Sequence, residues 1–222
     1  MTQIRTDTDM KEQKFIYPIV ISSPFGTGRF IRAVTKFTYN HAGIAFSPDV
    51  CSFYSFSRLY KKATFYGGFV KESILRYKSE SYKSHIKVFA VPVTDENYEK
   101  IKERISFYEE NKEDYIYNLI SAAAFIRRKN IKIKNAYTCL EFTLKMVKEF
   151  CEIGELNKRD FVSVKDFSEI LEPYKIYEGP TEKYFDGAEW ENDLFPKKIS
   201  LWFAVKKTLC NNAKLIKRFF AK

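Results

Sequence analysis

Histidine and cysteine are scarce in this chain of 222 residues, which contains two histidines and four cysteines. The cysteines stand at positions 51, 139, 151 and 210, with no C-x-x-C pair among them, and both histidines are distant from them in sequence. Structural zinc sites use short ligand spacings of that kind. We therefore expect no structural zinc.

The chain also lacks low-complexity tracts, and we expect no secretory leader. Its hydrophobic content of 45% and aromatic content of 17% exceed those of a disordered chain, and its length suits one domain with one core. Residues 1–14 are polar and charged, without the apolar stretch of a signal peptide. We therefore expect a cytoplasmic, reducing location, in which the cysteines remain free thiols.

Acidic residues are fewer than basic ones, which gives a formal net charge of +10 and an isoelectric point near 9.2. Such a charge favours anionic partners or surfaces. Because the lysines are spread along the chain and no nucleic-acid recognition motif accompanies them, we expect no nucleic-acid partner. Nothing in the composition indicates the oligomeric state.

Cys139 stands where a helix is predicted to begin. Basic and short polar residues precede it, and apolar residues then recur at three- and four-residue steps, at Leu140, Leu144, Val147 and Phe150. Free N–H groups and the helix dipole stabilise a thiolate at such an N-terminus, and they could also bind an oxyanion. Since cysteine attacks as its thiolate, Cys139 is the candidate nucleophile.

His41 stands at the start of a predicted β-hairpin. Residues 42–46 form a run of small and apolar residues, residues 47–49 form a turn, and residues 51–57 alternate like a returning strand. The hairpin would place His41 opposite Ser55 or its neighbours, where a polar group could hold the imidazole in one tautomer. His41 is thus the candidate base, although a free cysteine is also a common small core residue.

Four segments add to this pair, in a fixed order along residues 15–184. They are residues 31–35 (IRAVT) with 40–44 (NHAGI), residues 54–58 (YSFSR) with 67–72 (GGFVKE), residues 137–142 (YTCLEF), and residues 176–179 (IYEG) with Tyr184. The pattern resembles the circularly permuted papain-like hydrolases of the NlpC superfamily, specifically the YiiX-like branch, with lecithin retinol acyltransferase as a more distant relative. As in that family, and unlike papain, the histidine precedes the cysteine.

The resemblance implies an α+β fold of the permuted papain type, with a small antiparallel sheet packed against the helix that carries the nucleophile. It implies a cysteine hydrolase of amidase, peptidase or thioesterase type, acting on a small acyl, peptide or lipid substrate. Cys139 would form a thioester intermediate, His41 would act as general base, and Ser55 is selected as the orienting third residue. This chemistry needs no metal or organic cofactor.

Further polar residues of these segments are candidates for the oxyanion or substrate site, namely Tyr137, Glu141 and Tyr54. Glu141 could bind substrate or support the helix N-terminus electrostatically. Glu72 matches an acidic position of the family, but a structural ion pair is the preferred role for it.

Two other classes of function stay open. The chain could be a non-catalytic binding module, because a serine hydroxyl stabilises an imidazolium less than a carboxylate does. It could also be a membrane-associated lipid acyltransferase.

Two helices are predicted between the sheet and the nucleophile. The first is capped by Thr94 and carries apolar residues at Ile101, Ile105 and Tyr108. The second runs from about residue 114 to residue 128, and its residues 115–119 could line a substrate cleft or pack in the core.

Residues 185–222 differ in character from the hydrolase domain predicted at residues 15–184 and from the polar tail at residues 1–14. An acidic linker at residues 186–193 is followed by a basic segment, residues 197–222, whose apolar residues recur at helical spacing. One interpretation is an interfacial helix on an anionic membrane surface, which would make the protein peripheral to the membrane. The other is a terminal helix docked on the domain.

Overall fold

The computed structural model of the chain describes residues 13–24, 37–191 and 193–221. Its strands are β1 (Lys14–Ile21), β2 (His41–Ala45), β3 (Ser52–Arg58), β4 (Gly67–Ser73), β5 (His85–Phe89), β6 (Val91–Val93), β7 (Ile116–Tyr117), β8 (Ala136–Tyr137) and β9 (Lys175–Pro180). Within these described ranges the strands form one sheet in the order β8-β7-β4-β3-β2-β1-β5-β9, and β6 pairs with β1. The expected segment at residues 31–35 lies outside the described residues.

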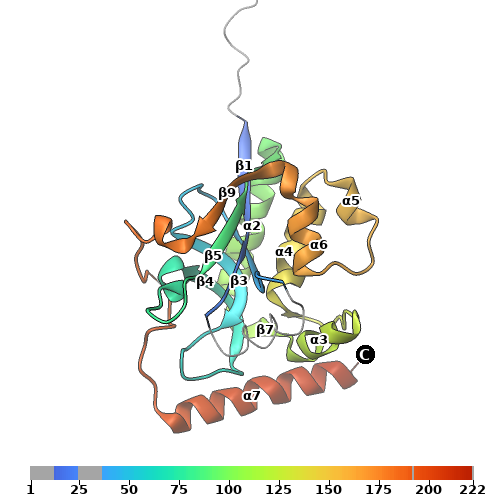
Figure 1. Cartoon of the computed structure of the whole chain (residues 1–222). Coiled ribbons are helices and arrows are strands. Elements are labelled where there is room, and N and C mark those ends of the chain that lie inside the picture. The colour runs from blue at the N-terminus through green and yellow to red at the C-terminus, as the bar shows by residue number, and fades with distance from the viewer. Residues whose placement is uncertain (1–12, 25–36, 192, 222) are drawn as a thin grey trace, which may run out of the picture.

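Helices lie beside the sheet and across one of its ends (Figure 1). The α-helices are α2 (Asp95–Glu110), α3 (Leu119–Ala124), α4 (Cys139–Phe150), α5 (Gly154–Asn157), α6 (Val164–Ile170) and α7 (Leu201–Phe220). Short 3-10 turns are η1 (Ile74–Tyr77), η2 (Lys112–Asp114), η3 (Phe125–Arg127), η4 (Glu172–Tyr174) and η5 (Thr181–Tyr184). The fold is therefore mixed α+β, as expected.

The sheet is larger than the small antiparallel sheet that we expected, and it is not wholly antiparallel. Strands β7 and β8 pair in parallel, with Tyr117 in register with Tyr137. The prediction that a helix starts at about residue 114 is also wrong, because Ile116 pairs with Gly68 of β4 and extends the sheet. The side chain of Asn118 then caps α3 by accepting from the Ser121 N–H, so that helix begins later than predicted.

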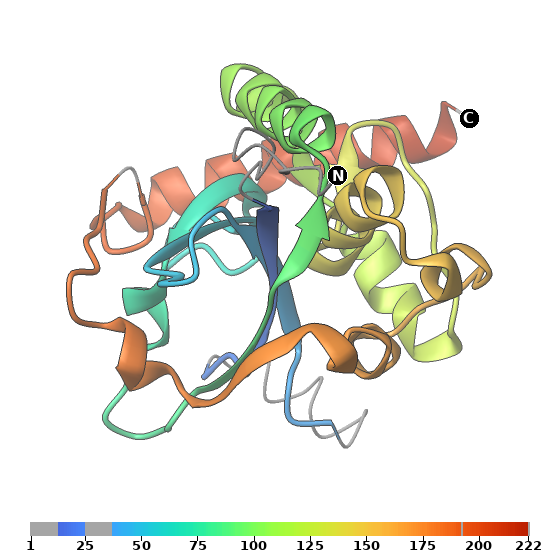
Figure 2. The ribbon, with the colours of Figure 1, turned by 90° about the horizontal axis from the view of Figure 1, so that it is seen from above.

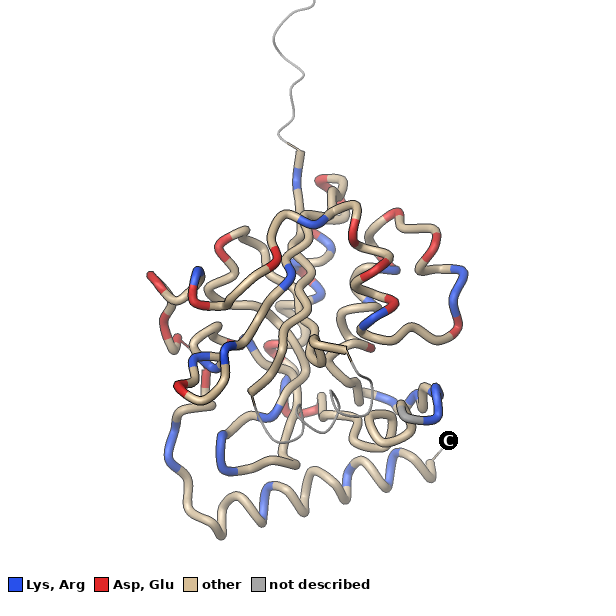
Figure 3. The backbone as a smooth tube through the Cα atoms, in the orientation of Figure 1, with Lys and Arg blue, Asp and Glu red and all other residues tan. Residues whose placement is uncertain are grey.

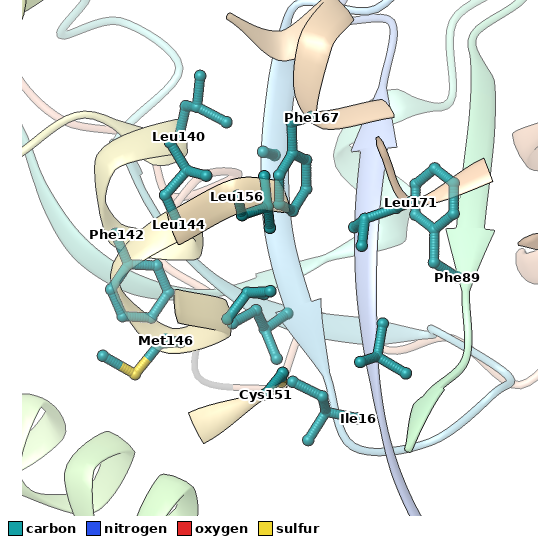
Figure 4. Close-up of a cluster of buried hydrophobic side chains, with 14 of the residues drawn as sticks. Ile16, Phe89, Leu140, Phe142, Leu144, Met146, Cys151, Leu156, Phe167 and Leu171 are labelled. Atoms are coloured by element: carbon teal, nitrogen blue, oxygen red, sulfur yellow. The ribbon is translucent and has the colours of Figure 1, made fainter. Parts of the chain in front are cut away.

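Helices α2 and α4 cover one face of the sheet, and Figure 2 shows them on the same side of the strands. Helix α4 is apolar on the sides that meet β2 and β3, and the phenyl ring of Phe142 is fully buried there. Figure 4 shows Phe142 and Met146 of α4 in one cluster with Phe167 of α6 and Ile16 of β1. Burying a side chain of this size contributes about 1.5–3 kcal/mol, so this cluster holds α4 firmly on the sheet.

A second apolar cluster lies on the opposite face of the sheet, beneath η1 and η5. It includes Ile21, Phe53, Tyr77 and Tyr184. Gly43 of β2 is required here because a Cβ atom at that position would stand 2.5 Å from the ring of Phe53. The ring of Phe53 can therefore lie directly against the strand that begins with His41.

Candidate active site

Cys139 is the first residue of α4, and a capping box fixes the start of that helix. The Thr138 hydroxyl accepts from the Glu141 N–H at 3.2 Å, and the Glu141 carboxylate accepts from the Thr138 N–H at 2.8 Å. The Glu141 carboxylate also accepts a hydrogen bond of 2.5 Å from the Ser121 hydroxyl. Of the two roles considered for Glu141, its contacts match support of the helix N-terminus, which places the thiol at the positive end of the dipole.

His41 is the first residue of β2, and its imidazole lies close enough to the sulfur of Cys139 to interact with it. The structure thus brings together the two residues singled out in the sequence, from segments 98 positions apart (139 − 41). Both are largely buried, with 8% of His41 and 6% of Cys139 exposed. Because Nε2 of the imidazole hydrogen-bonds the Glu72 carboxylate, Nδ1 is the nitrogen available to the sulfur.

Glu72 of β4 orients the imidazole, since its Oε1 accepts from Nε2 of His41 at 2.7 Å. The hydroxyl of Ser55 lies farther from the same nitrogen, at 3.4 Å, and it donates to the carbonyl of Ala42 at 2.7 Å. The geometry therefore favours Glu72 over Ser55, the residue chosen from the sequence, as the orienting group. A carboxylate also stabilises an imidazolium better than a hydroxyl does.

Ser55→Ala provides a direct test of the serine. We expect this variant to lose about 0.5–1.5 kcal/mol of stability, the value of one hydrogen bond, since the hydroxyl supports the carbonyl of Ala42. We expect its rate of reaction at Cys139 to change less than about tenfold, because Glu72 still holds the imidazole. Urea unfolding and a labelling time course measure the two effects. A near-complete loss of reactivity in a folded variant would restore Ser55 as the orienting residue.

The charges around His41 favour an ionised site. Burial lowers the pKa of His41, but the Glu72 carboxylate and the Cys139 thiolate oppose it and raise that pKa to about 10. Burial likewise raises the pKa of Glu72, whereas His41 and the Arg76 guanidinium lower it to about 2. The imidazole also lies against the rings of Phe53 and Tyr77, with centroids 6.3 and 6.2 Å away. Protein groups therefore replace most of the water around the His41 imidazole, and the Glu72 carboxylate stabilises its protonated form.

Arg76 of η1 and Asp193 support Glu72 from behind. Nε and Nη2 of Arg76 each donate to Asp193 at 2.6 Å, and Nη1 donates to Glu72 at 3.4 Å. The hydroxyl of Tyr77 donates to Glu72 at 3.0 Å. Asp193 is only 3% exposed, so the acidic segment that we predicted as a linker reaches the interior at this residue. Sequence reasoning did not identify this network.

Tyr117 is a further residue of the site, and it belongs to the run of residues 115–119 for which the sequence left cleft lining and core packing open. Its hydroxyl interacts with the sulfur of Cys139. Burial, followed by the negative charges of Cys139 and Glu141, raises the pKa of this phenol well above its usual value. It therefore stays protonated and can donate to a thiolate or to an oxyanion formed beside it.

The remaining candidates, Tyr137 and Tyr54, have packing roles in the structure. The ring of Tyr137 meets Phe56 edge-on at 5.3 Å, and its hydroxyl interacts with that of Tyr108. The ring of Tyr54 stacks on Phe69 at 5.9 Å, in the cluster beneath α2 and α4. These contacts give no support to a side-chain role for either tyrosine at the oxyanion, and the role in substrate binding stays a prediction.

The arrangement can form a thiolate, hold an imidazolium beside it, and present N–H and O–H donors to a developing negative charge. In the part of the chain that the structure describes, no group of three or more His, Cys, Asp or Glu side chains is placed to hold a metal ion. Comparison with family models, curated proteins and solved structures finds no match in any of the three.

Proposed function

We propose that the chain is a cysteine-dependent hydrolase or acyltransferase that forms a thioester on Cys139. The observation that carries the proposal is the series Cys139–His41–Glu72, in which the imidazole interacts with the sulfur and hydrogen-bonds the carboxylate, with the sulfur at the first turn of α4. A thiol activated by a base that a third group orients is the general arrangement for nucleophilic catalysis. Core packing alone does not account for it, because an ion pair of this kind is expensive to bury.

The reaction proceeds in two stages. The Cys139 thiolate attacks the carbonyl carbon of an amide, ester or thioester, and the oxyanion lies within reach of the Cys139 N–H and the Tyr117 hydroxyl. The tetrahedral intermediate collapses to a thioester as the imidazolium of His41 gives its proton to the leaving group. Neutral His41 then takes a proton from water, or from an acceptor alcohol or amine, as that nucleophile attacks the thioester. Collapse of the second tetrahedral intermediate breaks its bond to the sulfur, releases the acid, ester or amide product, and regenerates the thiolate beside the imidazolium.

We further propose that the fold is the permuted papain-like one of the NlpC superfamily. Its support is the chain order, with the histidine strand β2 before the nucleophile helix α4, together with the packing of α4 on β2 and β3. Glu72 completes the parallel, since it lies at the acidic position of the resembling segment 67–72 and bonds the imidazole. The bond that is cleaved and the acyl group that is accepted are set by substrate contacts beyond these residues.

The proposal is tested by acylating the intact chain with p-nitrophenyl acetate at neutral pH and locating the acyl group by mass spectrometry. We expect it on Cys139, and we expect His41→Asn to prevent it. Cys151 is a matched internal control, because it is as buried as Cys139, yet burial alone raises its pKa to about 12. Cys210 is exposed and controls for access. If the most exposed cysteine, Cys210, is acylated fastest, or if Cys139 is still acylated in His41→Asn, the chain would instead be a binding module.

A further inference from the structure

Helix α7 is docked on the domain along one side only. Ala204, Asn211 and Leu215 are its buried residues. The side-chain amide of Asn211 donates to the carbonyl of Gly67 at 3.0 Å, and Leu215 packs in a small cluster with Ile116 of β7. Figure 1 shows the helix running along the end of the domain where β7 and α3 lie. The docked interpretation of this segment is therefore confirmed, and it accounts for one face of the helix.

A second apolar face of α7 is exposed. Its residues and exposed fractions are Leu201 80%, Trp202 77%, Val205 41%, Leu209 65%, Ile216 52% and Phe220 78%. At 3.6 residues per turn these positions fall within an arc of about 100°. Burial against the domain does not explain this stripe, since Ala204, Asn211 and Leu215 lie on a different side of the helix.

Positive charge flanks the exposed stripe. Lys206, Lys214 and Lys217 are exposed; at 3.6 residues per turn Lys206 and Lys217 lie beside one edge of the apolar arc, and Lys214 lies farther round the helix. The helix contains no aspartate or glutamate, and Figure 3 shows basic positions along it with no acidic ones. A partner of this face must therefore accept apolar side chains and cations side by side.

We propose that α7 is an interfacial helix that binds the protein to an anionic phospholipid bilayer. The apolar stripe would enter the boundary between headgroups and acyl chains, while the lysines would meet the lipid phosphates. A stripe that extends along the whole of α7, with Trp202 and Phe220 near its two ends, suits a flat surface better than a groove in a protein partner. Among the described residues no helix is long and apolar enough to cross a membrane, so the contact is peripheral.

The test is flotation of the full chain with vesicles of phosphatidylcholine, either alone or mixed with phosphatidylglycerol. We expect binding to the anionic vesicles, weakened by salt, and little binding to phosphatidylcholine alone. The double variant Leu209→Glu/Ile216→Glu should lower the bound fraction by about tenfold or more. Both positions are exposed, so the fold is expected to survive, and a thermal melt verifies this.

The matched control is Phe107→Glu/Ile176→Glu, which adds the same charge at apolar positions on α2 and β9 that are 50% and 52% exposed. This control should bind the anionic vesicles as the unmodified chain does. An equal loss of vesicle binding in both double variants would mean that net charge alone causes the effect, and it would overturn the proposal. Absence of flotation with anionic vesicles would also overturn the proposal. If light scattering then shows a dimer, the exposed stripe is instead an interface between two copies of the chain. The test does not depend on acylation at Cys139.

Discussion

Replacement of Glu72 by glutamine is expected to slow acylation of Cys139 at neutral pH by about 10²- to 10⁴-fold, the range that general acid–base catalysis supplies. Glutamine keeps the size of the side chain but removes the charge that opposes the burial of His41. The imidazolium then loses its main stabilising partner, so a smaller fraction of His41 carries the proton that the leaving group needs. Initial rates of acylation with p-nitrophenyl acetate measure the effect, with Ser55→Ala as the control for a lost hydrogen bond to the same region.

The pH dependence separates a positioning role of Glu72 from a purely structural one. In the unmodified chain, His41 keeps its proton until the pH approaches about 10, because its pKa is raised above the ordinary value. Without the Glu72 carboxylate the pKa of His41 falls, so the alkaline limit of the rate profile should move to lower pH. Circular dichroism verifies that the variant is folded. A folded Glu72→Gln chain with an unchanged rate and an unchanged alkaline limit would remove Glu72 from the mechanism.

Local chemistry explains why the nucleophile helix and the histidine strand could be predicted from the sequence. A threonine cap and apolar residues at helical spacing mark the start of α4, and small and apolar residues followed by a turn mark β2. The juxtaposition of Cys139 and His41 did not follow from these local signals. It depended on the resemblance to a family in which the two segments meet.

Glu72 was harder to predict because its role depends on long-range pairing. The register of β3 on β4 places Phe53 opposite Glu72, so the carboxylate lies on the same face as the ring that packs against His41. An acidic residue in a strand of mostly small and apolar residues was the available signal. Sequence alone could not identify Arg76 as the buried cation that stabilises the charge of Glu72. Arg76 is itself held by Asp193, which is 121 positions from Glu72 in the sequence (193 − 72).

Substituting Arg76 by methionine is expected to destabilise the domain by about 3–5 kcal/mol, the cost of leaving a buried charge without its partner. Arg76 is 3% exposed and lies between two carboxylates, those of Asp193 and Glu72, which are 3% and 0% exposed. Methionine fills much of the same volume but leaves Asp193 without its bidentate donor. The free energy of unfolding is measured from urea denaturation, with the slope checked for a two-state transition.

The matched control for Arg76 is Arg104→Met, which removes an ion pair with Glu149 whose side chains are about one third exposed. That variant should lose less than about 1 kcal/mol, because solvent screens the pair. In the double variant Arg76→Met/Asp193→Leu the unpaired carboxylate is gone, so part of the stability should return. The loss in Arg76→Met and the recovery in the double variant would together show that the ion pair with Arg76 binds Asp193 to the domain. The acidic segment before α7 would then be linked to the residues that hold His41. A loss in Arg76→Met no larger than that in Arg104→Met would mean that the carboxylates find other partners or protons, and Glu72 would then need another explanation for its ionised state.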